Sequence, residues 1–262
     1  MNPIQFPRFL VVFGAFAGLA SGCGAETGNG IAGIRMALTQ GDEPPVQGMT
    51  LQTTDLAGTR FTIERSRAYI TSIELMLPGE KICEDEDFAQ SGFVVHCDSA
   101  KIRIEGPIIV NLMDGSSTPS LVNLKVPPAI YKRVDVRLAP GDPKKGVVMA
   151  GDSLDDRTFE AGGSFSYQQM TPTFDLSLRF DEDARFEDPA GVEVTAEAQE
   201  LLLLLDVAQW FNTLPITGCI QSGDLTITNG HLQIADKGAG QCSAIENALK
   251  ERLKNGTKLK KK

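Results

Sequence analysis

The side chains that most often do chemistry are few in this chain, which has five cysteines and two histidines among 262 residues. His96 adjoins Cys97, and His231 lies eleven residues before Cys242. Imidazole nitrogens are good copper ligands, so the two histidines would form a copper site if the fold brings their hairpins together. Otherwise each is a surface residue of its own hairpin. The short ligand spacing of structural zinc sites is absent from the sequence.

Three acidic clusters could supply oxygen ligands to calcium. They are residues 84–87, Asp152 with Asp155 and Asp156, and residues 181–183. None has the spaced acidic pattern of an EF-hand loop. Solvated acidic turns are the default interpretation of these clusters, and calcium stays open only as a cargo.

Motifs of the common enzyme classes are missing. The sequence has no Gly-x-Ser-x-Gly elbow, no His-Glu-x-x-His helix and no glycine-rich phosphate loop. A Ser-His-Asp site would have to use His96 or His231, each near a cysteine that we assign to a disulfide. Carboxylate pairs like those of glycosidases arise by chance among 34 acidic residues. We therefore predict a protein that is not an enzyme and needs no cofactor.

A short apolar run near the N-terminus indicates where the protein goes. Residues 9–20 are apolar and lead into Leu19-Ala20-Ser21-Gly22-Cys23. Such a run suits the core of a signal peptide and is too short to span a bilayer as a helix. The segment resembles the lipobox of bacterial lipoproteins, in which the cysteine is acylated and the preceding peptide is removed. The resemblance implies a signal peptide over 1–22, lipidation of Cys23 and a flexible tether over 23–30.

An ordinary secretory signal, with Cys23 left as a free thiol, is the alternative. For a lipoprotein, the residue after the cysteine bears on localisation. Gly24 stands there, whereas an aspartate would resemble the inner-membrane retention signal of enteric bacteria. We therefore expect attachment to the outer membrane rather than to the inner membrane.

The four other cysteines are an even number, which suits the oxidising compartment that an exported chain enters. Sequence alone allows three pairings of Cys83, Cys97, Cys219 and Cys242. We favour Cys83 with Cys97 and Cys219 with Cys242, because each pair flanks a polar, turn-rich segment between two apolar runs. Closing loops of this length stabilises a protein by about 3 kcal/mol each in the chain-entropy account.

Charge is unevenly distributed along the chain. Without residues 1–22 the net charge is −10, and residues 250–262 carry seven positive charges and one negative, which leaves −16 on the rest. An acidic body argues against nucleic acid as a partner, because phosphate binding needs a basic surface. We expect the lysines after Gly256 to extend freely. They either solubilise the terminus and complement the helix dipole, or dock on an acidic envelope polymer or lipid head groups.

Apolar residues alternate with polar ones along most of the chain, for example over 133–138 and 174–180. This period places one face of a strand on a core and the other in water, as in antiparallel sheets. Turn residues separate further runs of this kind, at 31–39, 60–77, 92–97, 101–113, 121–126, 192–198, 224–228 and 232–234. We predict an all-β antiparallel β-sandwich over residues 31–242.

Two segments depart from this alternation. Residues 201–205 are five consecutive leucines, which we interpret as a strand covered on both faces, with a short helix admitted over 206–212. Ser243-Ala-Ile-Glu is a capping box, and Ile245, Leu249 and Leu253 follow on one helical stripe. Residues 243–262 are therefore predicted to form a short amphipathic α-helix and the basic tail.

A family resemblance rests on two motifs. Gly106-Pro107-Ile108-Ile109-Val110-Asn111-Leu112 ends one strand, and Pro127-Pro128-Ala129-Ile130-Tyr131 leads into another. With residues 68–75, they resemble exported bacterial lipoproteins of unknown function that have a transthyretin-like or immunoglobulin-like β-sandwich, although Ala129 replaces that family's glycine. The resemblance implies this fold over about residues 31–210 and says nothing about activity. A neighbouring group of copper-associated periplasmic proteins shares the Tyr-Ile-x-x-Ile-x-Leu strand.

Together these observations predict a lipid-anchored β-sandwich of the cell envelope that acts as a non-catalytic binding or structural module. Its expected contacts are the membrane, through the N-terminal lipid, and an envelope polymer or protein. The alternative is a periplasmic carrier of copper or calcium, with His96 and His231 as candidate ligands.

Overall fold

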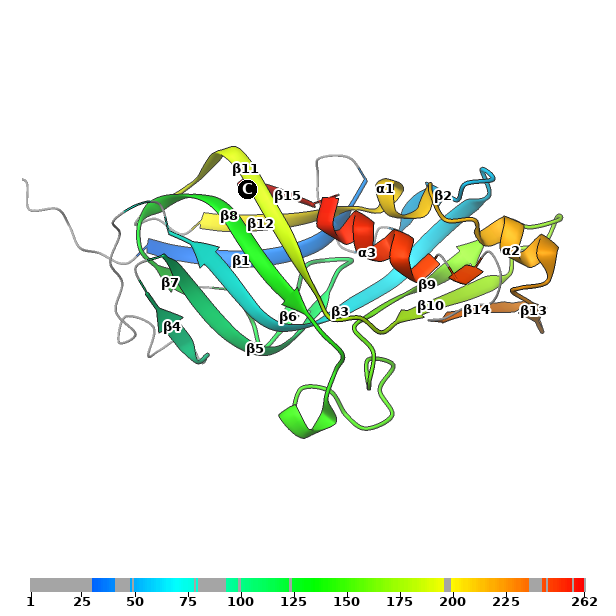
Figure 1. Ribbon diagram of the computed structural model, residues 1–262, viewed down its shortest axis with the longest axis horizontal. Coiled ribbons are helices and arrows are strands. Elements are labelled where there is room, and N and C mark those ends of the chain that lie inside the picture. Colours follow the sequence, from blue (N-terminus) through cyan, green and yellow to red (C-terminus); the bar gives the residue numbers. More distant parts are fainter. Residues whose placement is uncertain are drawn as a thin grey trace, which may run out of the picture.

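The computed structural model describes residues 30–40, 48, 50–77, 79, 93–98, 100–122, 124–195, 199–235, 242–243, 245–255 and 257–261. The described chain is mostly β-structure with a few short helices (Figure 1). The strands are β1 (Gly30–Thr39), β2 (Leu51–Thr54), β3 (Arg60–Met76), β4 (Val95–Cys97), β5 (Lys101–Asn111), β6 (Ser117–Thr118), β7 (Leu124–Val126), β8 (Ala129–Leu138), β9 (Phe159–Phe165), β10 (Thr173–Leu178), β11 (Glu182–Val194), β12 (Gln199–Asp206), β13 (Ile227–Thr228), β14 (His231–Ala235) and β15 (Thr257–Lys261). The helices are α1 (Val207–Phe211), α2 (Ile216–Ser222) and α3 (Ile245–Asn255), with a 3-10 turn at Pro143–Lys145.

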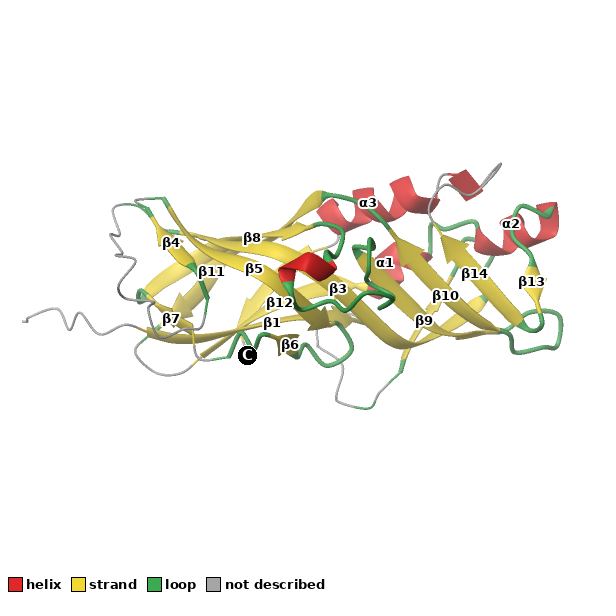
Figure 2. Cartoon of the chain, turned by 90° about the horizontal axis from the view of Figure 1, so that it is seen from below, coloured by secondary structure: helices red, strands yellow, loops and turns green. Residues whose placement is uncertain are grey.

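The strands form two sheets. The small sheet has the order β15-β12-β1-β7, and the large sheet follows β11-β8-β3-β9-β10-β14-β13, with β2 and β5 also paired to β3. The small sheet faces the half of the large sheet that contains β5, β8 and β11, whereas the helices cover the half that contains β9, β10 and β14 (Figures 1 and 2). The predicted all-β sandwich with a short C-terminal helix is confirmed.

Strand β3 joins the two halves of the large sheet. Its first part pairs with β2 and β9 and its second part with β5 and β8. Two register shifts, between Ile63 and Arg65 and between Ile70 and Ser72, accompany this change of neighbours. Bulges of this kind bend a strand and increase its twist, which lets one long strand serve both halves.

The leucine run of β12 is covered on both faces, as predicted. Leu201 to Leu205 are all buried, so the side chains on both faces of the strand are covered, and β12 pairs with β1 along one edge and with β15 along the other. The pairing of β1 with β12 is parallel, and so is that of β10 with β14. The expectation of antiparallel pairing throughout was therefore wrong, because alternation along a strand records burial and not the direction of its neighbour.

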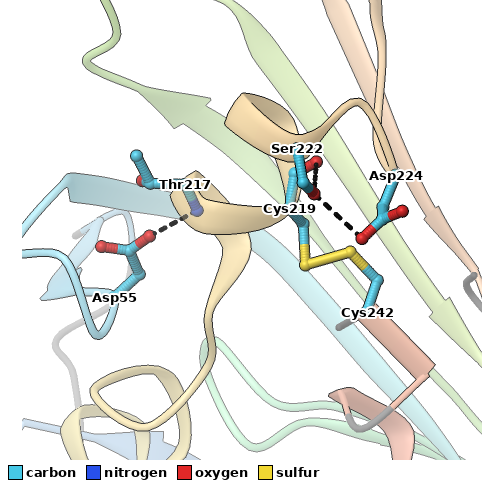
Figure 3. The surroundings of a disulfide bond; sticks show 6 residues. All are labelled: Asp55, Thr217, Cys219, Ser222, Asp224 and Cys242. Carbon is cyan, nitrogen blue, oxygen red and sulfur yellow. Dashed lines mark hydrogen bonds between the residues drawn. A yellow bond between two sulfur atoms is a disulfide. The ribbon is translucent and has the colours of Figure 1, made fainter. Parts of the chain in front are cut away.

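The predicted disulfide between Cys219 and Cys242 is present and ties α2 to the residues just before α3 (Figure 3). Both cysteines are buried in the main core. Cys97 is also disulfide-bonded, but its predicted partner Cys83 lies outside the described residues, as does Cys23.

A buried carboxylate fixes the start of α2 beside the β2–β3 turn. Asp55 is 3% exposed and accepts hydrogen bonds from the amides of Ala57, Thr59 and Thr217, at 3.0, 2.9 and 2.8 Å. The Thr217 bond is drawn in Figure 3. Buried carboxylates need such partners, so Asp55 connects two segments that are 162 positions apart.

The C-terminal helix is followed by a strand and not by a free tail. Ile245 and Leu249 of α3 are buried as predicted, while nothing is described of the Leu253 side chain. Strand β15 then pairs antiparallel with β12, and its Leu259 is buried. The prediction of freely extending lysines after Gly256 was wrong, because a single leucine between lysines gives a five-residue strand one core-facing anchor.

Other elements also differ from the sequence-based expectations. Strands β2 and β9 and helix α2 were not predicted, and β11 begins at Glu182, well before the run expected at 192–198, with a register shift between Glu187 and Val192. Strand β9 contains Gly162 and Gly163, which weaken strand propensity. A Cβ added to Gly163 would lie 1.9 Å from the Thr62 carbonyl oxygen. The glycine that hides this strand from prediction is therefore required by its close approach to β3.

Candidate functional site: the charged face of the large sheet

The two histidines lie at opposite ends of the molecule. His96 is exposed on β4, and His231 is on β14 (Figure 1). The His231 ring lies 3.0 Å from the Thr173 hydroxyl, and its Nε2 is 3.7 Å from Asp175 Oδ2. The fold thus does not bring together the two candidate copper ligands.

Protein groups already engage the acidic clusters that the structure describes. Asp181 and Asp183 both pair with Arg137, at 2.7 and 3.0 Å. Asp152, Asp155 and Asp156 bind separate partners: Arg67, the Gly151 amide and Arg179. The cluster at 84–87 lies outside the described residues. Within the described part of the chain, no three His, Cys, Asp or Glu side chains are grouped as around a metal ion.

Charged side chains instead gather on the outer face of the large sheet, over β5, β3, β8 and β11. The strand register places them in rows across the four strands. One row holds Arg103, Glu74, Asp135 and Arg185, and the next holds Glu105, Ser72, Arg137 and Asp183. We call these two rows, with Lys101, Arg133 and Glu187 beside them, the charged face.

Half-buried ion pairs fix the side chains at the centre of the charged face. Glu74 and Asp135 are cross-strand neighbours, with side chains only 22% and 16% exposed. Glu74 accepts a hydrogen bond from Lys101 at 2.9 Å, and Asp135 is held by both Arg133 and Arg185. The hydrogen bonds that Arg133 donates to the Asp135 carboxylate raise the pKa of Arg133, so this guanidinium stays charged. These half-buried pairs form the rigid floor of the site.

The rim of the charged face is far more open. Arg137 is 40% exposed, and its partners Asp181 and Asp183 are 58% and 62% exposed. Arg185 is also more than half exposed, and its nearest rim partner, Glu187, is 3.8 Å away. Exposed ion pairs contribute only about 0–1 kcal/mol. A ligand anion can therefore replace the rim carboxylates at little cost.

Four arginines line a groove above this floor. The groove has a volume of about 580 Å³. Its lining residues are Ser72, Glu74, Arg103, Arg133, Asp135, Arg137, Asp183 and Arg185. The lining side chains sum to a formal charge of +1, and Asp181, which pairs with Arg137, offsets this charge. The groove is thus nearly neutral on a chain whose net charge is −9, and its walls present the planar guanidinium donors that match carboxylate and phosphate.

A twenty-residue loop, residues 139–158 between β8 and β9, borders the groove. It covers Tyr69 of β3 and is attached to the sheet through Arg67, whose Nη2 lies 2.8 Å from Asp152 Oδ1. Burial alone would raise the pKa of Asp152, but the bonds from the Leu154 amide and Arg67 lower it overall. On the other side of the loop lies a second groove of about 640 Å³.

The second groove is less suited to an anion. Its lining includes Arg65, Arg67 and Arg157, but also Glu64, Asp155, Glu160 and Asp175. Arg65 pairs with Asp175, and Arg67 with Glu160. With four acidic and three basic side chains, the lining of this groove sums to a negative charge.

Comparison with protein-family models, curated proteins and solved structures found no match for this chain. In the part of the chain that the structure describes, no helix has both the length and the apolar character needed to cross a bilayer.

Sequence reasoning identified the strands of the site without identifying the site. The alternation of Arg133, Asp135 and Arg137 with apolar residues was interpreted only as the solvent-exposed face of a strand. The missing information was the register, which sets this row beside charged residues of β5 and β11. Similar alternation at 101–105 and 183–187 was the available signal, but adjacency of these strands is not readable from one sequence.

Proposed function

We propose that the protein is a lipid-anchored, non-catalytic binding module of the bacterial cell envelope, and that the groove of the charged face binds anionic groups of an envelope polymer. The proposal rests on two features of the groove. Half-buried ion pairs hold Glu74 and Asp135 in place, whereas the exposed arginines at the rim can change their ion-pair partners. A binding site needs preorganised supports and ligand-facing groups that can change partners. Glu74 and Asp135 supply the first, and Arg137 and Arg185 supply the second.

Binding is favoured over catalysis by the composition of the groove. Its lining includes neither histidine nor cysteine, the side chains that most often serve as general base or activated nucleophile. A carboxylate or phosphate ligand would take guanidinium bonds that Asp181 and Asp183 now occupy. Aromatic side chains, which stack on neutral sugars, are also absent from this lining. We therefore infer recognition of acidic rather than neutral polymers.

The lipid anchor is supported by the lipobox-like sequence ending at Cys23. The described structure begins at Gly30 with β1, so a short segment separates the proposed acylated residue from the folded body. Such a segment suits a module held close to a membrane. Grouped metal ligands are not found among the described residues.

Titration with soluble acidic polymers tests the proposed ligand class. Polygalacturonate offers carboxylates, polyphosphate offers phosphates, and dextran serves as the neutral comparison. Ion pairs at exposed arginines contribute about 0–1 kcal/mol each, so Arg137→Gln with Arg185→Gln should weaken binding by up to about thirtyfold. Arg60→Gln is the matched control, because Arg60 is exposed on β3 and lines neither groove.

Two results would contradict the proposal. One is equal affinity of the double variant and the Arg60→Gln control for both acidic polymers. The other is equal binding of dextran and polygalacturonate. Binding should also weaken with added salt, because exposed charges are screened.

A further inference from the structure

The 139–158 loop is a rigid projection with its own small core. Val148 and Leu154 pack on Tyr69 of β3. The Gly141 amide donates to the Arg157 carbonyl at 2.9 Å and closes the base of the loop. Figure 1 shows the loop in green, extending away from the body, and Figure 2 views the molecule from the side on which it lies. Compact loops of this type present a preformed surface.

The tip of the loop, residues 143–151, is both basic and apolar. Lys144 and Lys145 are exposed, and neither forms an ion pair with any residue that the structure describes. Met149 is 80% exposed, more than any other large hydrophobic residue that the structure describes. The tip contains no Asp or Glu. Acidic residues adjoin the tip on both sides. The Asp142 carboxylate accepts the Lys144 amide, the Asp155 carboxylate accepts the Gly151 amide, and Asp152 pairs with Arg67 of β3.

We propose that this tip docks on an anionic phospholipid surface, with Met149 entering the head-group layer and both lysines facing lipid phosphates. Charge complementarity supports this partner, because the tip carries two positive charges on a chain with net charge −9. The acidic remainder of the chain disfavours any broader contact with such a surface. Each lysine near an anionic surface contributes about fivefold in affinity, and salt weakens this contribution.

Docking of the tip would set the orientation of the whole molecule. Residues 64–67 of β3 line one groove and Ser72 and Glu74 line the other, while Tyr69 lies under the loop between them. The two grooves therefore flank the loop on the same face. A docked tip turns both grooves toward the membrane surface. The inference itself does not depend on what either groove binds.

Tryptophan fluorescence tests the contact, because the chain has one tryptophan, Trp210, and it is buried. A chain beginning at Gly24 keeps every described residue and is held on vesicles by an N-terminal histidine tag and a chelating lipid. This attachment does not depend on acylation of Cys23. Met149→Trp reports on the tip. Leu56→Trp is the comparison, because Leu56 is also exposed, at 65%, and lies far from the tip in the β2–β3 turn.

On vesicles rich in phosphatidylglycerol, Met149→Trp should shift its emission to shorter wavelength and be quenched by brominated acyl chains. Leu56→Trp should show neither effect. Adding Lys144→Glu and Lys145→Glu to Met149→Trp should abolish the shift, as should vesicles of phosphatidylcholine alone. The inference is overturned if the tip reporter is unquenched, if the Leu56→Trp reporter is quenched equally, or if reversal of the lysine charges has no effect. Arg137→Gln with Arg185→Gln should leave the signal unchanged, so the two proposals fail separately.

Discussion

Replacing Leu259 with alanine tests whether the C-terminal strand stabilises the sandwich. Leu259 is 1% exposed and pairs with Leu203 of β12. A buried Leu→Ala substitution costs about 2–5 kcal/mol, and the cost falls where the structure can close the cavity. Strand β15 lies at the end of the small sheet, where it can shift inward. We therefore expect the free energy of unfolding to fall by about 2–3 kcal/mol.

The melting temperature should fall with it. In a domain of this size, 1 kcal/mol corresponds to about 2–4 °C, so we expect a decrease of about 4–12 °C in calorimetry of the oxidised protein. Lys260→Ala is the matched control on the same strand, because Lys260 is only partly buried, and it should change the free energy by less than about 0.5 kcal/mol. Equal effects of the two substitutions would refute the docking of β15.

Four further substitutions test other parts of the reasoning. Cys23→Ser should move the protein from the detergent-extracted membrane fraction to a soluble or unprocessed form; unchanged fractionation would contradict the lipid anchor. Gly163→Ala should destabilise the fold by about 1–3 kcal/mol in urea unfolding, because its Cβ would meet the Thr62 carbonyl oxygen, and a neutral effect would refute that contact. Asp55→Ala leaves three amides, that of Thr217 buried, without their carboxylate acceptor and should cost about 1–3 kcal/mol, measured in the same way; a cost below about 1 kcal/mol would count against its structural role. The lowered pKa of Asp152 means that its stabilising effect is present above its ordinary value of 3.8 and is lost as pH falls through the folded value. Asp152→Asn should therefore flatten the acid limb of the stability curve, and an unaltered acid limb would contradict this.

Sequence reasoning predicted the fold class well because burial on one face leaves a period-two pattern. The strands β1, β3, β5, β8 and β10 were recognised in this way, and the leucine run of β12 by its uniform apolar character. Strand β9 was not predicted, because its two glycines interrupt the alternation of apolar and polar residues. The same glycines allow the backbone of β9 to approach β3 closely. The parallel pairs were not predicted, because the relative direction of two paired strands depends on neighbours that are distant in sequence.

The site was less predictable than the fold. The cysteines were informative, since local spacing suggested the Cys219–Cys242 bond that the structure contains. The histidines were misleading as a pair, because His96 adjoins Cys97 and His231 precedes Cys242 by eleven residues, while their strands lie far apart. The charged face depends on register among four strands. Register is fixed by core packing and bulges across the whole sheet, so no single segment encodes it.

The lysines of the C-terminal strand have a structural explanation that the sequence did not suggest. Strand β15 ends the small sheet in hydrogen-bond order, but its other side lies close to β11, where the Thr257 hydroxyl donates to the Arg185 carbonyl. Lys258 and Lys260 flank the buried Leu259 on this strand. The same residues that suggested a free basic tail thus belong to a strand that lies between β12 and β11. The alternation of Lys258, Leu259 and Lys260 directs the leucine into the core and leaves the two lysines only partly buried.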